Sequence, residues 1–593
     1  MADGLVSKKC AVFDDVIFAP GAEKDFDTGS YNPIHRWPEL KTETRILPKG
    51  YRVSDEYRPT ICDIKFVRDT PVKLRNGLRI YIDLYMPVDA DKKYPVILAW
   101  TPYGKLDPPN NYGLYKDRAL MKQKYSTGLD TFEGPEPDYW ISNGYVVAVA
   151  DSGGSTHSEG ALWYYGNQEG LDVYDAVEWL GTQSWSNGKV GMVGNSWLAI
   201  SQYFGAAHKP PHLTAIAPWE GVSDTYRDMI CRGGIPSAEF LGALNKTLRL
   251  NESVEDIPSM LAKYPLMNDY WSKEKRVAFE NIEIPAYIVA SYCSFIHPYG
   301  TFRAYKKIRS KEKWLRVHNT QEWFDQQTPK YRDDLVRFYD YYLKGIDNGW
   351  PDTPKVRISL LDPTGQDVTD VPEADWPIPR TDYTKLYLDA RDMRLSESPV
   401  GEEASVRYET KNRDERLVPF SRPTYTAEAS DTGEGLVRFR IKFDKDTKLC
   451  GYFKMHLFVS TDAGDDMDLF AYVTKEDSMG WPYYPISLGV DYKGPQGRLR
   501  VSHRKIENDE YWDWRHEHKA EEPIAPNRIV EIETILWPVG MIWRSGESLV
   551  FTVSSAELQL FEFPTPPIKT RNKGTHTLYT GGKYNSYIEI PKI

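Results

Sequence analysis

The stretch that most constrains the fold is an apolar run that ends in a glycine, an asparagine and a serine and then continues as a helix-compatible segment. The run covers residues 190–193, the turn is Gly194-Asn195-Ser196, and the segment after it covers residues 198–207. A sharp strand-to-helix turn forces the serine out of the sheet, beside the first N–H groups of the helix. We therefore expect an exposed Ser196 hydroxyl; the alternative is a buried serine after an ordinary strand.

This geometry is the nucleophile elbow of α/β-hydrolases, whose usual pattern is Gly-x-Ser-x-Gly. Leu198 occupies the place of the last glycine, and the nearest small residue is Ala199, one position later. A larger residue at this point is expected to narrow the space around the elbow.

Short apolar runs alternate with helical segments through the first 350 residues. Each run ends in polar or small residues; the runs cover residues 95–100, 145–150, 189–193, 213–217, 285–290 and 314–318. This alternation predicts a parallel sheet with helices on both faces, and in such sheets the chemistry lies at the carboxyl ends of the strands.

The same pattern divides the chain of 593 residues, which is too long for a single core. We expect an arm (1–60), a first part of an α/β core (61–212), a strand with a helical cap (213–284), a second part of the core (285–351) and an all-β sandwich (352–593). The cap follows from about 65 residues with helical signals, among them a candidate capping box, Ser253-Val254-Glu255-Asp256. The sandwich follows from short alternating strands separated by Gly, Pro and Asp.

A serine hydroxyl needs a base, an acid that orients the base, and donors aimed at the oxyanion. In this fold the chain order is Ser, then Asp or Glu, then His. His318 ends the last predicted strand and is the favoured base; His297 is its competitor, and His157 precedes Ser196. A lone histidine is more often structural than catalytic.

Tyr103 and the backbone N–H of Trp197 are the candidate oxyanion donors, although Tyr103 could instead be a packing residue in a turn.

The orienting acid is harder to assign, because no carboxylate follows the run at residues 285–290. Glu220 and Asp224, one strand earlier, are the candidate substitutes. They could instead bind Arg227 or cap a helix, which would leave a Ser–His dyad that retains part of the acceleration. Four further residues at these strand ends are expected to contact the substrate: Trp219, Tyr292, Ser294 and His297.

Several ordered segments make the chain similar to the CocE/NonD hydrolases, the cocaine esterase and X-Pro dipeptidyl-peptidase group. They are Thr101-Pro102-Tyr103-Gly104-Lys105, QSWSNGKVGM at residues 183–192, Pro218-Trp219-Glu220-Gly221, FYDYYLKG at residues 338–345 and SYIEIP at residues 586–591. The resemblance implies an α/β-hydrolase with a helical cap and a C-terminal jelly roll. It also implies that Ser196 is the nucleophile, His318 the base, and Tyr103 with the Trp197 amide the oxyanion hole.

At three places the chain has residues that differ from those common in the CocE/NonD hydrolases. The family's acid falls at or next to Ser294, the last elbow glycine is absent with Ala199 as the nearest small residue, and Ser152 stands where an arginine is common. The favoured function is a serine hydrolase that cleaves an ester, lactone or amide of a small organic substrate through an acyl-enzyme on Ser196. The missing acid motivates an alternative, a repurposed scaffold for acyl transfer, cyclisation or rearrangement with a Ser–His dyad. A third hypothesis is a non-catalytic binding protein.

Composition limits the partners. The net charge of −11 without a basic stripe argues against nucleic acid, and no apolar run is long enough to cross a membrane. Five scattered cysteines and the absence of an apolar leader at the N-terminus favour the cytoplasm. We find no metal, phosphate or dinucleotide motif and expect no cofactor. The expected partner is a small-molecule substrate, and the oligomeric state stays open, a homo-oligomer included.

Overall fold

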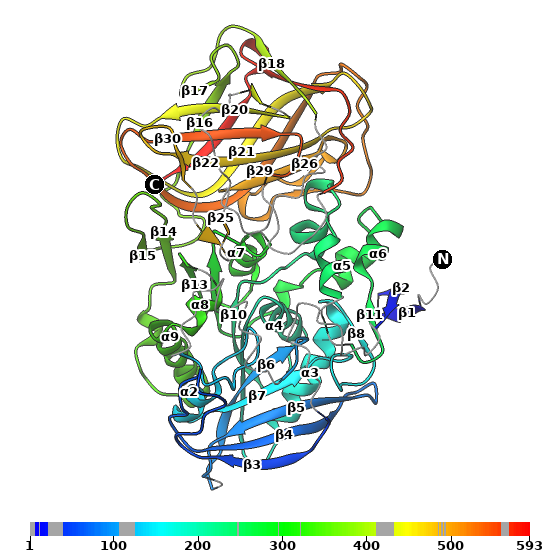
Figure 1. Ribbon diagram of the computed structural model, residues 1–593, viewed down its shortest axis with the longest axis vertical. Coiled ribbons are helices and arrows are strands. Elements are labelled where there is room, and N and C mark those ends of the chain that lie inside the picture. Colours follow the sequence, from blue (N-terminus) through cyan, green and yellow to red (C-terminus); the bar gives the residue numbers. More distant parts are fainter. Residues whose placement is uncertain are drawn as a thin grey trace.

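The computed structural model describes most of the chain: residues 6–10, 12–21, 39–89, 91–105, 125–245, 248, 250–294, 296–320, 322–410, 432–433, 435–483, 486–487, 490–491, 494–558 and 568–593. An α/β unit occupies the lower part of Figure 1, and a domain built from strands lies above it. We call the segment between the strands that end at Trp219 and begin at Ala286 the cap, and residues 382–593 the β-domain.

The α/β unit is built on one eleven-stranded sheet. Its strands, in spatial order, are β15 (Val368–Glu373), β14 (Val356–Leu360), β13 (Lys313–His318), β12 (Ala286–Ser291), β10 (Leu213–Trp219), β9 (Ser186–Asn195), β6 (Tyr94–Thr101), β7 (Val146–Asp151), β5 (Arg79–Met86), β4 (Ile64–Lys73) and β3 (Glu43–Leu47). The strands from β14 to β7 pair in parallel, and β15, β5, β4 and β3 extend the edges antiparallel. The predicted parallel sheet is confirmed.

Helices cover this sheet because its central strands are apolar on both faces; every residue of β7 and β12 is buried. The helices of the unit are α2 (Pro137–Ser142), α3 (Asn167–Gly181), α4 (Trp197–Ala207), α7 (Pro298–Lys307), α8 (Glu322–Gln327) and α9 (Pro329–Tyr339). The α4 helix is buried along its whole length and packs against β9 and β10. A helix that is buried on every face fits only in such a central position.

The cap is largely helical, as predicted. Its elements are η4 (Thr225–Ile230), η5 (Arg232–Gly234), α5 (Glu239–Asn245), β11 (Ser253–Glu255), α6 (Ile257–Lys263), η6 (Tyr270–Glu274) and η7 (Phe279–Asn281). The predicted capping box is wrong: its first three residues form β11, which pairs with β2 (Phe13–Pro20) and β8 (Ala161–Leu162). Asp256 instead caps α6 by accepting from the Ser259 N–H at 3.1 Å, because strand pairing engages the backbone before it.

Pairing also anchors segments outside the core. The strands β1 (Val6–Cys10) and β2 form a hairpin that joins the cap through β11, and β3 joins the central sheet. The β14 and β15 strands follow residue 352 in sequence but extend the central sheet. In the described part of the chain, no helix has the length and apolar character needed to cross a bilayer.

The β-domain consists mainly of a thirteen-stranded sheet. Its strands are β16 (Asp382–Asp389), β17 (Arg394–Ser396), β18 (Ala404–Glu409), β19 (Thr432–Gly433), β20 (Leu436–Lys442), β21 (Thr447–Thr461), β22 (Asp468–Glu476), β23 (Pro482–Tyr483), β26 (Gln496–Arg500), β29 (Val530–Trp543), β30 (Ser548–Ser554), β31 (Thr575–Thr580) and β32 (Tyr587–Lys592). Two short pairs accompany it, β24 (Ile486–Ser487) with β25 (Val490–Asp491) and β27 (Ile506–Asn508) with β28 (Arg515–His516). The domain contacts the cap where β26 meets η5, and it contacts α7 through β29 and η11 (Tyr511–Asp513).

Candidate active site

Ser196 lies at the turn between β9 and α4, which confirms the predicted strand–turn–helix unit. Its backbone has φ 53° and ψ −114°, a strained conformation for a residue with a side chain. The Ser196 N–H donates to the carbonyl oxygens of Trp219 and Glu220, each at 3.1 Å, which ties the turn to the end of β10. These bonds hold the strained backbone and leave the Ser196 side chain partly exposed.

Gly194 explains why the elbow accepts Leu198 in place of the usual glycine. A Cβ atom at position 194 would lie 2.3 Å from the Leu198 Cβ, and the φ of Gly194 is 153°. The turn therefore needs a glycine at position 194 for Leu198 to pack against it. The close approach of strand and helix is provided by the first glycine of the motif, because the last one is absent.

His297 is the histidine that meets the serine. Its Nε2 lies 3.1 Å from the Ser196 Oγ. The residue follows β12 and immediately precedes α7, so the loop after the strand carries it past the edge of the sheet toward the elbow. A hydrogen bond of this length allows the imidazole to take the hydroxyl proton.

His318, the favoured base of the sequence analysis, is not in contact with the serine. Its Nε2 is 2.5 Å from the Glu220 Oε1, and its Nδ1 has no hydrogen-bond partner among the described residues. The physical reason is the strand order: β13 is separated from β9 by β12 and β10, and His318 is still part of β13, in register with Ser291. The His318 side chain therefore reaches Glu220, just after β10, and does not reach Ser196.

The carboxylate behind the candidate base comes from Glu322, which the sequence analysis did not consider. The Glu322 Oε2 lies 3.2 Å from the His297 Nδ1. Ser294, where the family pattern has its acid, places its Oγ 3.1 Å from the same nitrogen. Glu322 is the first residue of α8, just after β13. The histidine therefore lies in the loop after β12, where the acid was expected, and the acid lies after β13, where the histidine was expected.

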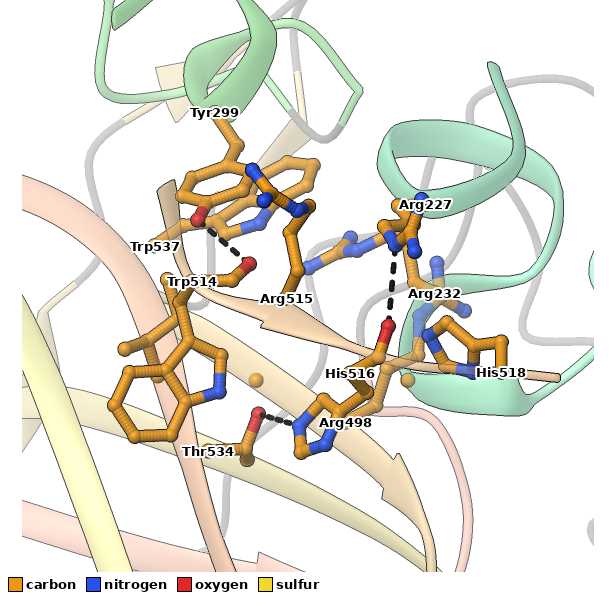
Figure 2. Close-up of a pocket in the computed structure, with 13 residues that line it drawn as sticks. Arg227, Arg232, Tyr299, Arg498, Trp514, Arg515, His516, His518, Thr534 and Trp537 are labelled. Atoms are coloured by element: carbon orange, nitrogen blue, oxygen red, sulfur yellow. Dashed lines mark hydrogen bonds between the residues drawn. The ribbon is translucent and has the colours of Figure 1, made fainter. Parts of the chain in front are cut away.

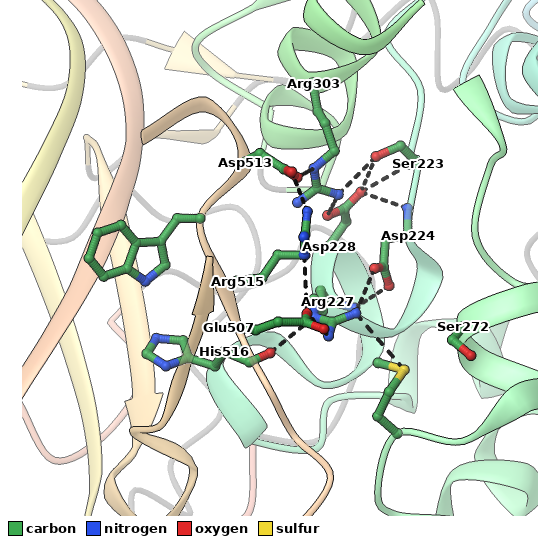
Figure 3. Close-up of polar contacts among 12 residues, drawn as sticks. Ser223, Asp224, Arg227, Asp228, Ser272, Arg303, Glu507, Asp513, Arg515 and His516 are labelled. Atoms are coloured by element: carbon green, nitrogen blue, oxygen red, sulfur yellow. Dashed lines mark hydrogen bonds and ion pairs between the residues drawn. The ribbon is translucent and has the colours of Figure 1, made fainter. Parts of the chain in front are cut away.

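Glu220 and Asp224, the acids proposed from the sequence, have different surroundings. The Glu220 Oε2 is 3.6 Å from the His297 Nδ1, while its Oε1 binds His318. Asp224 caps η4 and accepts from the Arg227 Nη1 at 3.0 Å, so it engages Arg227 and a helix end rather than a histidine (Figure 3). Glu220 thus belongs to the histidine cluster, and Asp224 does not.

The cluster changes the proton affinity of its members. Burial alone would lower the pKa of His297, but Glu322 and Glu220 together raise it to about 10. Burial and then repulsion from Glu220 raise the pKa of Glu322 to about 7. Burial acts in the same direction on Glu220, yet His318 and His297 hold its pKa below the usual range. The charged form of His297 is therefore favoured at neutral pH, and the neutral base forms as the pH rises.

The two candidate oxyanion donors lie beside the elbow. Trp197 is the first residue of α4, so its N–H has no acceptor within the helix. Tyr103 follows β6, and its ring packs edge-on against Trp197, with centroids 6.3 Å apart. The Trp197 indole is held by Glu169, whose Oε1 accepts from its Nε1 at 2.8 Å. The two candidate donors therefore come from Trp197, the residue after Ser196, and from a tyrosine whose ring packs against it.

Glu133 is a second residue that the sequence analysis missed. It is buried, its carboxyl interacts with the Tyr103 hydroxyl, and its Oε1 accepts from the Trp323 Nε1 at 3.2 Å. Burial, and then repulsion from Glu322, raise the pKa of this carboxyl well above its usual range. Burial thus favours the protonated form of Glu133 more than it would for an exposed carboxyl.

Two of the predicted substrate contacts face the protein instead. The Trp219 Nε1 donates to the Asp325 Oδ2 at 3.1 Å, and the Tyr292 hydroxyl lies 3.5 Å from the Cys450 Sγ of the β-domain. Both side chains are fully buried. Ser294 and His297, the other two, belong to the hydrogen-bonded cluster described above.

A cation could be bound by the same cluster. Among the described residues, Glu220, His297 and Glu322 each offer a ligand atom, and these atoms lie within 4.8 Å of one another. The 3.2 Å separation of His297 and Glu322 also suits a hydrogen bond, and the 3.6 Å separation of His297 and Glu220 suits an ion pair. A cation held there would compete with the orientation of His297, so the same atoms cannot serve both purposes at once.

The mainly parallel sheet with a serine on its strand–helix elbow defines an α/β-hydrolase. The crystal structure of a CocE/NonD family hydrolase from Staphylococcus aureus matches this chain with a TM-score of 0.83 and 30% sequence identity, covering 95% of this chain and 99% of that chain. The chain belongs to the CocE/NonD family and is a hydrolase.

Other comparisons agree with this assignment. A model of the X-Pro dipeptidyl-peptidase S15 family matches residues 76–260, and a model of the C-terminal non-catalytic domain of X-Pro dipeptidyl-peptidases matches residues 348–589. The chain is 27% identical over 375 residues to the cocaine esterase of Rhodococcus sp. (strain MB1 Bresler), a match that spans 54% of this chain and only 61% of that relative. An α-amino acid ester hydrolase structure shares the fold, with a TM-score of 0.66 and 18% identity.

Proposed function

We propose that the protein is a serine hydrolase that cleaves an ester or amide of a small organic substrate through an acyl-enzyme on Ser196. The observation that carries the proposal is the chain of contacts from the Ser196 Oγ to the His297 Nε2 at 3.1 Å and from the His297 Nδ1 to the Glu322 Oε2 at 3.2 Å. The nucleophile contacts the base and the base contacts the orienting acid, which is the order of contacts that acyl transfer requires.

In the first half of the reaction, the neutral His297 imidazole takes the hydroxyl proton while the Ser196 Oγ attacks the substrate carbonyl carbon. The Trp197 N–H and the Tyr103 hydroxyl donate to the oxyanion that forms. The imidazolium then gives its proton to the leaving alcohol or amine, and an ester on Ser196 remains. Water repeats the sequence: His297 takes one of its protons, its oxygen attacks the ester, and the proton returns to the Ser196 Oγ.

Two considerations favour net hydrolysis over the repurposed-scaffold alternative. That alternative was motivated by a missing acid, and Glu322 supplies a carboxylate at the base. The relatives named above include a cocaine esterase and an α-amino acid ester hydrolase, which supports an ester as the first substrate class to test. A lactone is an internal ester and fits the same steps.

The test is covalent labelling followed by product analysis. A fluorophosphonate probe should label the wild-type chain on Ser196, and the Ser196→Ala variant should stay unlabelled. Hydrolysis of an aryl ester in water enriched with ¹⁸O should put one heavy oxygen into the acid product, because water cleaves the acyl-enzyme. Labelling at another residue, or full turnover by the alanine variant, would reject Ser196 as the nucleophile. A transferred or isomeric product without heavy oxygen would reject hydrolysis.

Glu133 provides a prediction about the oxyanion side of the site. Because burial favours the protonated, uncharged form of this carboxyl, Glu133→Gln should preserve most of the activity, since glutamine is an uncharged isostere of that form. Glu133→Met, of similar size but apolar, leaves the Tyr103 hydroxyl unsupported. Its kcat should fall, by less than the about 10²–10³-fold cost of losing an oxyanion donor outright.

Steady-state kinetics of the two variants on one ester, with melting temperatures as the folding control, make the comparison. Equal, large losses in both variants would mean that Glu133 acts as a carboxylate and that the neutral assignment is wrong.

A further inference from the structure

A pocket separate from Ser196 lies where the cap meets the β-domain (Figure 2). About 440 Å³ of space free of protein atoms lies in and in front of it, and this volume includes open solvent. The cap contributes residues of η4 and η5, α7 contributes Tyr299, and the β-domain contributes residues of β26, β28 and β29. We call it the interdomain pocket; a ligand in it would touch both units.

The wall of the interdomain pocket is rich in cationic side chains. Four arginines line it, Arg227, Arg232, Arg498 and Arg515, and none of its described lining residues carries a carboxylate. The two histidines of the wall add little charge: burial lowers the pKa of His516 to about 4, and burial and then His516 and Arg227 lower that of His518. The positive charge therefore belongs to the arginines.

Ion pairs fix two of these arginines in place (Figure 3). The Arg227 Nη1 and Nη2 lie 3.0 Å from Asp224 and 3.0 Å from Glu507, and the Arg515 Nε lies 3.2 Å from Glu507. These acids hold the guanidinium groups from outside the lining. Such pairs preorganise the wall before any ligand arrives, which reduces the cost of binding.

Arg498 and Trp514 present donors without acceptors. The Trp514 side chain is 5% exposed, and its indole N–H finds no acceptor in the described part of the chain. Arg498 is 9% exposed; its Nε has no described hydrogen-bond partner, and its nearest ion pair, to Glu557, is 3.5 Å long. Buried donors are normally paired, so two unpaired ones beside the same pocket point to an acceptor that a ligand would supply.

Aromatic rings complete the wall. The Arg232 guanidinium carbon lies 3.4 Å from the centre of the Trp537 ring, which holds the planar group by stacking. Tyr299 donates to the Trp514 carbonyl oxygen at 2.9 Å and closes the side next to α7. In Figure 2, Arg227 and Arg232 lie on the side of the cap, across from the Trp514 indole. Cationic forks and aromatic faces together suit an anion that carries an apolar body.

We propose that the interdomain pocket binds a small organic anion, whose carboxylate or phosphate group accepts from Arg498 and from the Trp514 indole. The guanidinium of Arg498 would supply two parallel N–H donors, and the stacked Arg232 would supply further positive charge. Anion binding at this pocket does not require the chemistry of Ser196, so the proposal can be tested separately from the proposed hydrolase activity.

Isothermal titration of the full-length chain with benzoate and with inorganic phosphate, at constant ionic strength set by sodium chloride, tests the proposal. The wild-type chain should bind at least one of them saturably, and the stronger of the two identifies the preferred head group. Trp514→Phe removes the indole N–H, together with part of the ring, and should weaken binding about tenfold. Arg498→Lys keeps the positive charge opposite Glu557, so the fold should be preserved. It removes the paired N–H donors of the guanidinium, and it should weaken binding by a similar or larger factor.

Trp481→Phe is the matched control, because Trp481 is 44% exposed and does not line the interdomain pocket; its affinity should equal that of the wild type. Melting temperatures should rise with the anion in the wild type and the control, since binding stabilises the folded state. Absence of saturable binding by both anions would overturn the proposal, and so would equal affinities for the wild type, Trp514→Phe and Arg498→Lys.

Discussion

Replacement of His297 by glutamine is expected to lower kcat about a million-fold, the cost of removing the base from a catalytic triad whose members act as a unit. The reason is the 3.1 Å contact between the His297 Nε2 and the Ser196 Oγ, which a glutamine amide cannot replace as a proton acceptor. The measurement is kcat for an aryl ester under saturating conditions, together with the rate of fluorophosphonate labelling.

His318→Gln is the matched control, with the same substitution in the neighbouring histidine. Glutamine can still donate to Glu220, so the buried carboxylate keeps a partner. We expect this variant to retain most of the wild-type kcat, because neither ring nitrogen of His318 reaches the serine. If His318→Gln is inactive and His297→Gln is active, then the assignment of the base is reversed.

Replacement of Glu322 by glutamine is expected to lower kcat about ten-thousand-fold, as the loss of the carboxylate that orients a catalytic histidine does. A second effect concerns pH. The Glu322 carboxylate raises the pKa of His297, so its removal lowers that pKa, and the neutral imidazole persists to more acidic pH. The acidic limb of the kcat/KM profile should lie above the ordinary histidine range in the wild type and move to lower pH in the variant.

Asp224→Asn is the control for the acid. Asp224 binds Arg227 and caps η4, so its loss should lower the melting temperature and leave the position of the acidic limb unchanged. An acidic limb that moves in Asp224→Asn and stays in place in Glu322→Gln would contradict the role given to Glu322.

The elbow could be predicted from the sequence because it is local. Strand, turn and helix follow one another within about twenty residues, and the strained backbone of Ser196 belongs to the Gly-Asn-Ser turn itself. The parallel sheet and the strand-rich C-terminal part were predictable for a related reason, since both depend on the periodicity of apolar residues.

The partners of the serine could not be predicted in the same way, because they depend on how loops fold back over the sheet edge. His318 stands at the end of its strand and was favoured for that reason, whereas His297 reaches the elbow only through the loop before α7. The rule that an acid precedes the histidine excluded Glu322 from consideration. Its position just after the last strand predicted for the core was the available signal, since that loop lies at the same edge as His297.

The most direct test of the account is a crystal structure of the protein after reaction with a fluorophosphonate. We predict a phosphonyl group on the Ser196 Oγ, its oxygen bonded to the Trp197 N–H and the Tyr103 hydroxyl, with the His297 Nε2 facing the Oγ and the Nδ1 on Glu322. An adduct with His318 against the Oγ, or with His297 turned away from Glu322 and the serine, would contradict the central claim that this hydrolase uses His297 as its base.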